Sequence, residues 1–211
     1  MKNARLLSRP LTALLATAAF GVAFIASSSA SAQIKQPGAH PRYSVELDPH
    51  LVLAWDGPFN NHFDDEGFGL GFRATIPIIE QGPITKINNS LGIGFGGDFI
   101  FYGDGHCRYR RWDFDDDCSG TSLYLPVVAQ WNFWLTKSIS VFGEPGLAIR
   151  YSSLHREYPC GPDGFCEDDD TDLDFIPFVL WGGGRFLVGD NVGITVRLGW
   201  PYLGVGVGFL I

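Results

Sequence analysis

The sequence predicts an all-β protein, an eight-stranded antiparallel up-and-down β-barrel that spans a membrane. Three observations lead to this prediction. Apolar residues alternate with small or polar residues at a period of two along most of the chain, and the connections between the alternating segments are alternately long and short. After residue 32, no segment holds the roughly 20 consecutive apolar residues that a spanning helix needs. A chain of this kind enters a bilayer only as strands.

The first 32 residues predict a cleaved secretory signal peptide. Lys2, Arg5 and Arg9 precede an apolar run from Leu11 to Ile25, and a stretch of small residues then ends at Ala32. We therefore expect a short N-terminal segment at 33–42 and a barrel domain at 43–211. The exported chain would carry a formal charge of −11 instead of −8, because three cations leave with the leader. This balance argues against a nucleic-acid partner, which needs a basic surface.

Eight alternating segments give the expected strands in chain order. Each sets a continuous apolar face against a face of glycine and polar residues, and the segments are 43–55, 68–76, 91–101, 123–133, 139–151, 173–188, 192–199 and 203–211. In the sixth segment Trp181-Gly182-Gly183-Gly184 interrupts the alternation, so we expect a β-bulge there.

The connections predict how the strands are arranged. Three long polar loops are expected at 56–66, 103–119 and 154–172, and shorter turns separate them. In an up-and-down meander, alternate connections fall at the same end of the barrel. The three long loops therefore extend from one rim.

The apolar face is expected to point outward. Turned to water, the opposite face would expose mostly glycine, whereas inside a narrow eight-stranded barrel small residues fit. Membrane strands must also close on themselves, because unpaired backbone groups are costly in hydrocarbon. The alternative is a secreted soluble lipocalin-like ligand-binding barrel, in which the apolar face points inward.

Two sets of side chains follow from this orientation. Acids and arginines on the inward face are expected to neutralise one another as an interior charge cluster, because buried charges need partners: Glu46, Arg73, Asp98, Glu144, Arg150 and Arg197. Aromatic residues near strand ends are expected to form belts at the membrane interfaces: Trp55, Trp112, Trp131, Trp134, Trp200, Tyr43, Tyr151 and Tyr202.

In strand number, loop alternation and terminal strand, residues 43–211 resemble the small outer-membrane β-barrel proteins of Gram-negative bacteria, the superfamily of OmpA-like and OmpX-like eight-stranded barrels. The resemblance implies residence in the cell outer membrane, contact with its lipid and lipopolysaccharide, and insertion by the barrel assembly machinery. Members usually end in an aromatic residue that this machinery reads. Here the last residue is Ile211, which departs from that pattern.

The acidic run from Asp168 to Asp174 is the densest charge block of the chain. Its simplest interpretation is a solvated loop. A sharper hypothesis is a Ca²⁺ site, because calcium prefers oxygen ligands, with four alternate carboxylates as ligands: Asp168, Asp170, Asp172 and Asp174.

Four cysteines in an exported chain predict disulfides. The expected pairs are Cys107–Cys118 and Cys160–Cys166, because each closes one loop locally. A bridge between the two long loops is the alternative.

These features predict a non-enzymatic, monomeric outer-membrane barrel with disulfide-braced acidic loops, for envelope integrity or surface interaction. No catalytic or cofactor motif points to an activity. Besides the soluble lipocalin-like barrel, an envelope-modifying outer-membrane enzyme is a further alternative.

Overall fold

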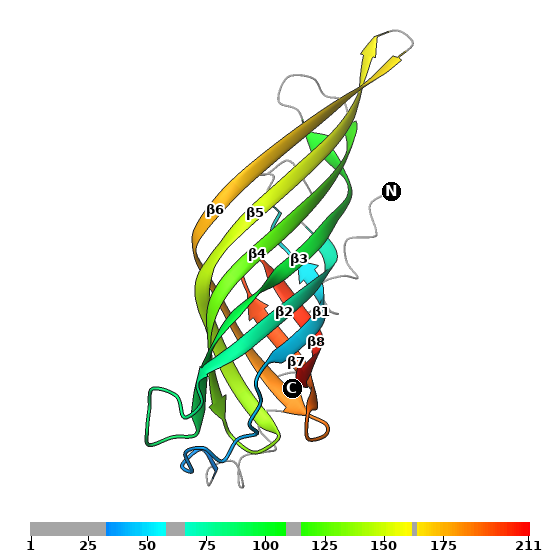
Figure 1. Ribbon diagram of the computed structural model, residues 1–211. Coiled ribbons are helices and arrows are strands. Elements are labelled where there is room, and N and C mark those ends of the chain that lie inside the picture. The colour runs from blue at the N-terminus through cyan, green and yellow to red at the C-terminus, as the bar shows by residue number, and fades with distance from the viewer. Residues whose placement is uncertain (1–32, 58–65, 109–114, 162–163) are drawn as a thin grey trace.

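A computed structural model of the protein describes residues 33–57, 66–108, 115–161 and 164–211 (Figure 1). Within these ranges, residues 104–108, 115–118, 156–161 and 164–168 are described as backbone only. No helix in the described ranges is long and apolar enough to cross a bilayer.

Eight strands form one closed barrel in chain order, and every neighbouring pair is antiparallel. The strands are β1 (Glu46–Ala54), β2 (Gly67–Ile79), β3 (Asn89–Arg108), β4 (Asp115–Trp134), β5 (Ile139–Gly161), β6 (Gly164–Leu187), β7 (Val192–Gly199) and β8 (Tyr202–Leu210). The barrel closes where β8 pairs with β1, with Phe209 opposite Leu47. The predicted eight-stranded antiparallel barrel is confirmed.

Four strands are much longer than the sequence predicts. β3, β4, β5 and β6 contain 20, 20, 23 and 24 residues, so the expected loops 103–119 and 154–172 are wrong over most of their length. The hydrogen bonds between strands join backbone groups and do not depend on the side chains. Strand pairing therefore continues into polar segments, where the alternation of apolar and polar residues is lost. The four strands rise together beyond the other four at one end (Figure 1).

The expected β-bulge lies elsewhere in β6. From Trp181 to Gly184 the strand pairs in register with β5, and the register shifts instead between Ile176 and Val179. Pro177 lies in this interval, and proline has no backbone N–H to give to a ladder. The bulge reverses which residues face inward, and this reversal explains the blurred alternation.

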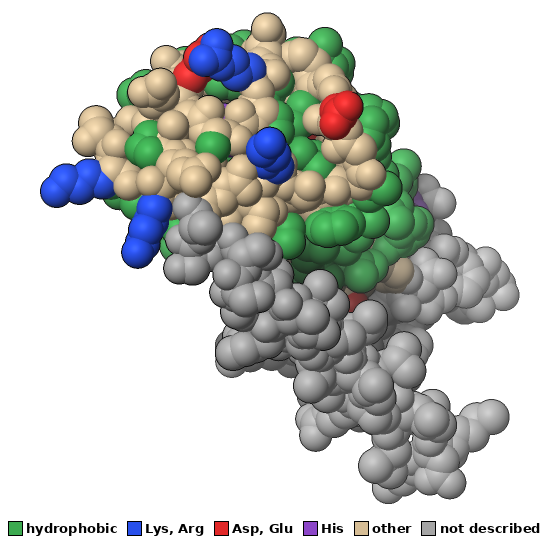
Figure 2. All heavy atoms as spheres, turned by 90° about the horizontal axis from the view of Figure 1, so that it is seen from below, with side chains coloured by type: hydrophobic (Ala, Val, Ile, Leu, Met, Phe, Trp, Pro, Cys, Tyr) green, Lys and Arg blue, Asp and Glu red, His purple; other side chains and the backbone are tan. Residues whose placement is uncertain are grey.

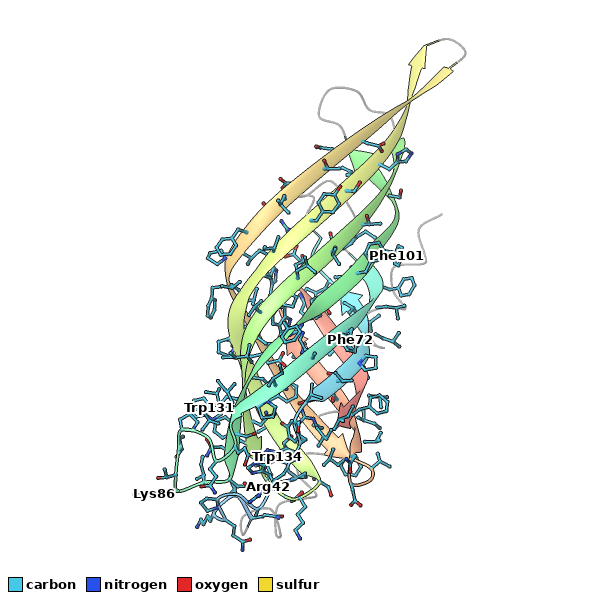
Figure 3. All side chains as sticks on the ribbon, in the orientation of Figure 1. Arg42, Phe72, Lys86, Phe101, Trp131 and Trp134 are labelled. Atoms are coloured by element: carbon cyan, nitrogen blue, oxygen red, sulfur yellow. The ribbon has the colours of Figure 1, made fainter. Side chains whose placement is uncertain are left out.

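The barrel is apolar outside and polar inside. Phe72 and Phe101 point away from the barrel wall, and a belt of exposed aliphatic and aromatic residues surrounds it (Figure 3). Arginine, glutamate and aspartate side chains are instead buried within it. This polarity is the reverse of a soluble lipocalin-like barrel, and it makes the fold a transmembrane β-barrel.

The N-terminal segment packs against the end of the barrel that has the short turns. The backbone N–H of Asn88 donates to the Ile34 carbonyl oxygen at 2.7 Å. His40 is buried, donates from Nδ1 to Asn88 Oδ1 at 2.7 Å, and stacks on Trp134 with ring centroids 5.6 Å apart. The segment therefore lies against the β2–β3 connection and the end of β4.

Candidate functional site

Charged side chains fill the middle of the barrel because inward positions of several strands meet there. β1 contributes Asp48 and His50, and the facing strands contribute Arg73, Asp98, Glu144 and Arg197; all six are buried. Gly71 lies between His50 and Asp98 in the strand register. A Cβ atom at Gly71 would lie 2.3 Å from both His50 Nε2 and Asp98 Oδ1. The missing side chain therefore lets His50 reach Asp98 across the intervening strand.

Arg197 joins two acids at the centre of this network. Its Nε donates to Glu144 Oε2 at 2.8 Å, and its Nη2 donates to Glu144 Oε1 at 3.2 Å and to Asp48 Oδ2 at 3.0 Å. Bidentate pairing of this kind fixes both partners more firmly than a single bond does. The contact ties β7 to β1 and β5 through side chains.

Asp98 is the second centre of the network. It accepts hydrogen bonds from His50 Nε2 at 2.9 Å, from Arg73 Nη2 at 3.3 Å and from the Tyr202 hydroxyl. His50 Nδ1 also faces the Asp48 carbonyl oxygen at 2.9 Å. Contacts at both ring nitrogens fix the orientation of the imidazole.

Two other ion pairs lie nearer the ends of the barrel. Toward the short turns, Arg185 pairs with Glu46 and lies over the Trp134 and Phe142 rings, 5.8 Å from each centroid. Toward the long strands, the partly exposed Arg150 pairs with Asp174. Of the six residues expected in one cluster, Arg73, Asp98, Glu144 and Arg197 therefore meet, whereas Glu46 and Arg150 form separate pairs.

The buried charges are paired with one another. Arg73 and Arg197 link Asp98, Glu144 and Asp48 in one series of ion pairs, which His50 extends at Asp98, and Arg185 pairs separately with Glu46. A filled interior of paired charges is a structural plug, because each charge holds its partner in place.

Two aromatic residues assigned to the interface belts lie inside the barrel instead. Trp134 and Tyr202 are fully buried, and Tyr202 binds Asp98. Both residues occupy inward-facing positions of their strands. The alternation of side chains along the strand therefore decides that they are buried, although both lie near a strand end. Trp55, Trp200 and Tyr151 are exposed, as a belt requires.

Three residues of the interior network lay outside the predicted cluster: Asp48, His50 and Arg185. Asp48 and His50 are identified by strict alternation with Glu46, whereas the bulge in β6 changes the parity of Arg185.

The acidic run lies in a paired strand rather than in a loop. Asp170, Asp172 and Asp174 pair in register with Leu154, Ser152 and Arg150 of β5. Asp174 binds Arg150, and His155 Nδ1 lies 2.7 Å from Asp169 Oδ1 on the other face. The Asp168 side chain lies outside the described part of the chain. Among the residues that are described, no group of three or more histidine, cysteine or acidic side chains is arranged for a metal.

The cysteine side chains also lie outside the description, but their backbone register is defined. Cys107 lies opposite Asp116, and Cys118 lies opposite Gly105, so the two cysteines are diagonal neighbours on β3 and β4. Cys166 on β6 lies opposite Tyr158, two residues before Cys160 on β5. Each expected cysteine pair thus lies on two adjacent strands, β3 and β4 for the first and β5 and β6 for the second.

The second feature of interest is the part of β3–β6 that rises beyond the barrel, which we call the protruding sheet (residues 103–108, 115–119, 155–161 and 164–169). One edge of β6 pairs with β5 along the whole strand. The other edge pairs with β7, but only from Trp181 onward. Among the described residues no strand pairs with the other edge of Gly164–Leu180. We call this segment the β6 edge.

The solved structures similar to this chain include three of Ail, the attachment invasion locus protein of Yersinia pestis. A crystal structure with the heparin analogue sucrose octasulfate gives a TM-score of 0.46 at 11% identity, covering 78% of this chain and 97% of that chain. A second crystal structure gives 0.41 at 14%, with coverage of 80% and 99%. The structure in a phospholipid bilayer nanodisc gives 0.39 at 11%, with coverage of 81% and 100%. No protein-family model and no curated protein matches the chain.

Proposed function

We propose that this protein is a non-enzymatic outer-membrane barrel that recognises an extended polypeptide at the cell surface. The observation that supports this function is the β6 edge, which pairs on one side only within the described chain. An open edge presents a row of backbone N–H and C=O groups, and an extended peptide binds such a row as an added strand.

The side chains along the β6 edge suggest the chemistry of the partner. Asp169, Asp170 and Asp172 are exposed, and Leu173, which is 68% exposed, lies opposite the belt residue Tyr151. A strand that alternates basic and apolar residues complements both the acidic residues and this apolar position. Acidic ligands are disfavoured, because segments 56–66, 103–119 and 150–174 hold seventeen acidic and five basic residues.

The proposal includes the cellular setting. The signal peptide at 1–32 would export the chain, and the barrel assembly machinery would insert it as a monomer, since the barrel closes within one chain. Lipopolysaccharide would then surround the base of the protruding sheet. We further propose that Cys107–Cys118 and Cys160–Cys166 bridges brace this sheet, and that Ca²⁺ near Asp170 and Asp172 would moderate its charge.

The interior supports a structural role rather than an enzymatic one. The side chains of Arg73, Asp98 and Glu144 are completely shielded from solvent, and Arg73 pairs with both acids. A substrate would have no access to them. The exposed surface of the protruding sheet is therefore the part of the molecule offered to a partner.

The experiment uses the full barrel, refolded into nanodiscs, and a fluorescent octapeptide of alternating valine and lysine. We expect saturable binding that weakens with salt. The matched probe carries an N-methyl group on every backbone amide nitrogen, which keeps its charge but removes the donors of both strand edges. We expect binding of this probe to be lost.

A truncated barrel provides the second arm. His155 and Asp169 are cross-strand partners, so replacing residues 156–168 with an Asn-Gly turn shortens the sheet without altering the barrel. Weaker binding to this variant supports the proposal. Equal binding of the methylated and unmethylated peptides would show simple charge attraction and overturn strand addition.

A further inference from the structure

Charge is segregated between the two ends of the molecule. The three lysines that follow residue 32 are Lys35, Lys86 and Lys137. Lys86 and Lys137 lie in the β2–β3 and β4–β5 connections, and Lys35 follows Ile34, which is bonded to Asn88 at the same end. Arg42 also lies at this end (Figure 3). Only two acids, Glu80 and Asp190, belong to the segments at this end, which are 33–42, 80–88, 135–138 and 188–191. The opposite end is strongly acidic. We call the four cations the basic rim.

The basic rim is available for a ligand. All four of its side chains are exposed. In the described part of the chain none of them forms an ion pair. Lysine and arginine side chains lie at separate points across this face rather than in one cluster (Figure 2). A spread of this kind suits an extended anionic surface better than a single small anion.

Apolar side chains next to the rim place it at the edge of the lipid belt. Ile79 and Ile84 are 43% and 39% exposed on either side of the turn that leads to Lys86. Trp131 lies beside them and donates from Nε1 to Asn89 Oδ1 at 3.0 Å. Tryptophan favours the membrane interface, so we expect the ammonium group of Lys86 to lie near the depth of the lipid phosphates.

We propose that the basic rim binds the phosphate groups of anionic glycerophospholipids in the leaflet on the short-turn side. Juxtamembrane lysines and arginines are attracted to anionic lipid surfaces, and the attraction adds up over separate residues. Lys86 and Lys137 are carried by the connections β2–β3 and β4–β5, and Lys35 and Arg42 by the N-terminal segment. The rim therefore engages several lipids around the barrel and selects for a net negative headgroup.

Native mass spectrometry of the refolded full barrel tests the proposal. The protein is titrated with an equal mixture of phosphatidylglycerol and phosphatidylcholine of the same acyl chains, and the ratio of the bound lipids is counted. We expect phosphatidylglycerol to be preferred. Each of Arg42→Met, Lys86→Met and Lys137→Met is expected to reduce the preference about five-fold, and the reductions multiply.

Charge-conserving and opposite variants are the controls. Lys86→Arg and Lys137→Arg should keep the preference, and Asp190→Asn should increase it. All of these positions are exposed, so heat-modifiable gel migration should report a folded barrel in every case. An unchanged lipid ratio in the triple methionine variant would overturn the proposal. Loss of binding to isolated peptidoglycan with an unchanged lipid ratio would also overturn it, and would assign the rim to the cell wall.

Discussion

The Arg197 guanidinium binds both carboxylate oxygens of Glu144, at 2.8 and 3.2 Å, although the two residues are 53 positions apart in the chain. Both side chains are almost completely shielded from solvent. A pair in this setting is costly to break, since removing one partner leaves the other as an uncompensated buried charge.

Replacing Arg197 with methionine should destabilise the barrel by about 3–5 kcal/mol. Urea titration of the refolded protein, followed by heat-modifiable gel migration, measures the change. The Arg197→Met/Glu144→Gln double variant should recover part of the loss, because it leaves fewer unpaired charges. The exposed Lys137→Met should change stability by less than about 0.5 kcal/mol. If Arg197→Met were as stable as Lys137→Met, the ion pairs would not support the barrel.

Glycine is required at position 71 by the close approach of His50 and Asp98. The added methyl group of Gly71→Ala would overlap both side chains, and overpacking of this kind costs about 1–3 kcal/mol. Gly143→Ala is the matched control, because a Cβ there would meet nothing within 4 Å. The two variants are compared by urea unfolding. Equal stabilities would mean that His50 and Asp98 move apart freely.

The N-terminal segment should detach more often when Asn88 loses its side-chain oxygen. Asn88→Ala removes the acceptor for His40 Nδ1, and one such hydrogen bond contributes about 1 kcal/mol, or roughly a five-fold change in opening. Trypsin cleavage after Lys35 and Arg42 should accelerate accordingly. Asn191→Ala loses a bond to the Leu210 carbonyl oxygen instead, and should leave cleavage unchanged. Equal rates in all three proteins would contradict the docking contact.

Tyr43 should make the barrel sensitive to alkali. Burial, followed by the negative charge of Glu46, raises the pKa of Tyr43 from 10.0 to about 12. Above pH 10 the unfolded chain releases this proton while the folded barrel retains it, so stability is lost as the pH rises from 10 to 12. Wild type should therefore lose about 2 kcal/mol more than Tyr43→Phe over this interval. Parallel urea titrations of both proteins at pH 9 and near pH 12 measure this difference in stability loss. Identical losses in the two proteins would refute the raised pKa of Tyr43.

Peptide mapping without reduction should recover Cys107 with Cys118 and Cys160 with Cys166. Each pair lies on two adjacent strands in the backbone register, whereas Cys118 faces Arg156, four residues before Cys160. Alkylation before and after reduction counts the bridges. A peptide that joins Cys118 to Cys160 would support the alternative connectivity.

Strand faces could be predicted from the sequence because alternation directly reports which side of a strand is apolar. Asp48 and Thr195 are buried at positions that parity alone identifies. The ends of β3–β6 could not be predicted, since backbone pairing in Asp115–Asp117 leaves no hydropathy signal.

The alternation along a strand predicts that a side chain faces inward, but it does not predict which inward side chain of another strand it contacts. Arg185 and Glu46 are 139 residues apart and meet only because of the stagger between strands and the extra residue in β6. Their pairing therefore needs the three-dimensional register.

The segregated charge gives the molecule an electric dipole along the barrel axis. Copies inserted in the same direction carry parallel dipoles, so their acidic ends repel when they approach sideways. The repulsion acts over roughly 8 Å at physiological salt. Neighbouring barrels should therefore stay dispersed in the plane of the membrane, which leaves the β6 edge of each copy accessible to a partner of opposite charge.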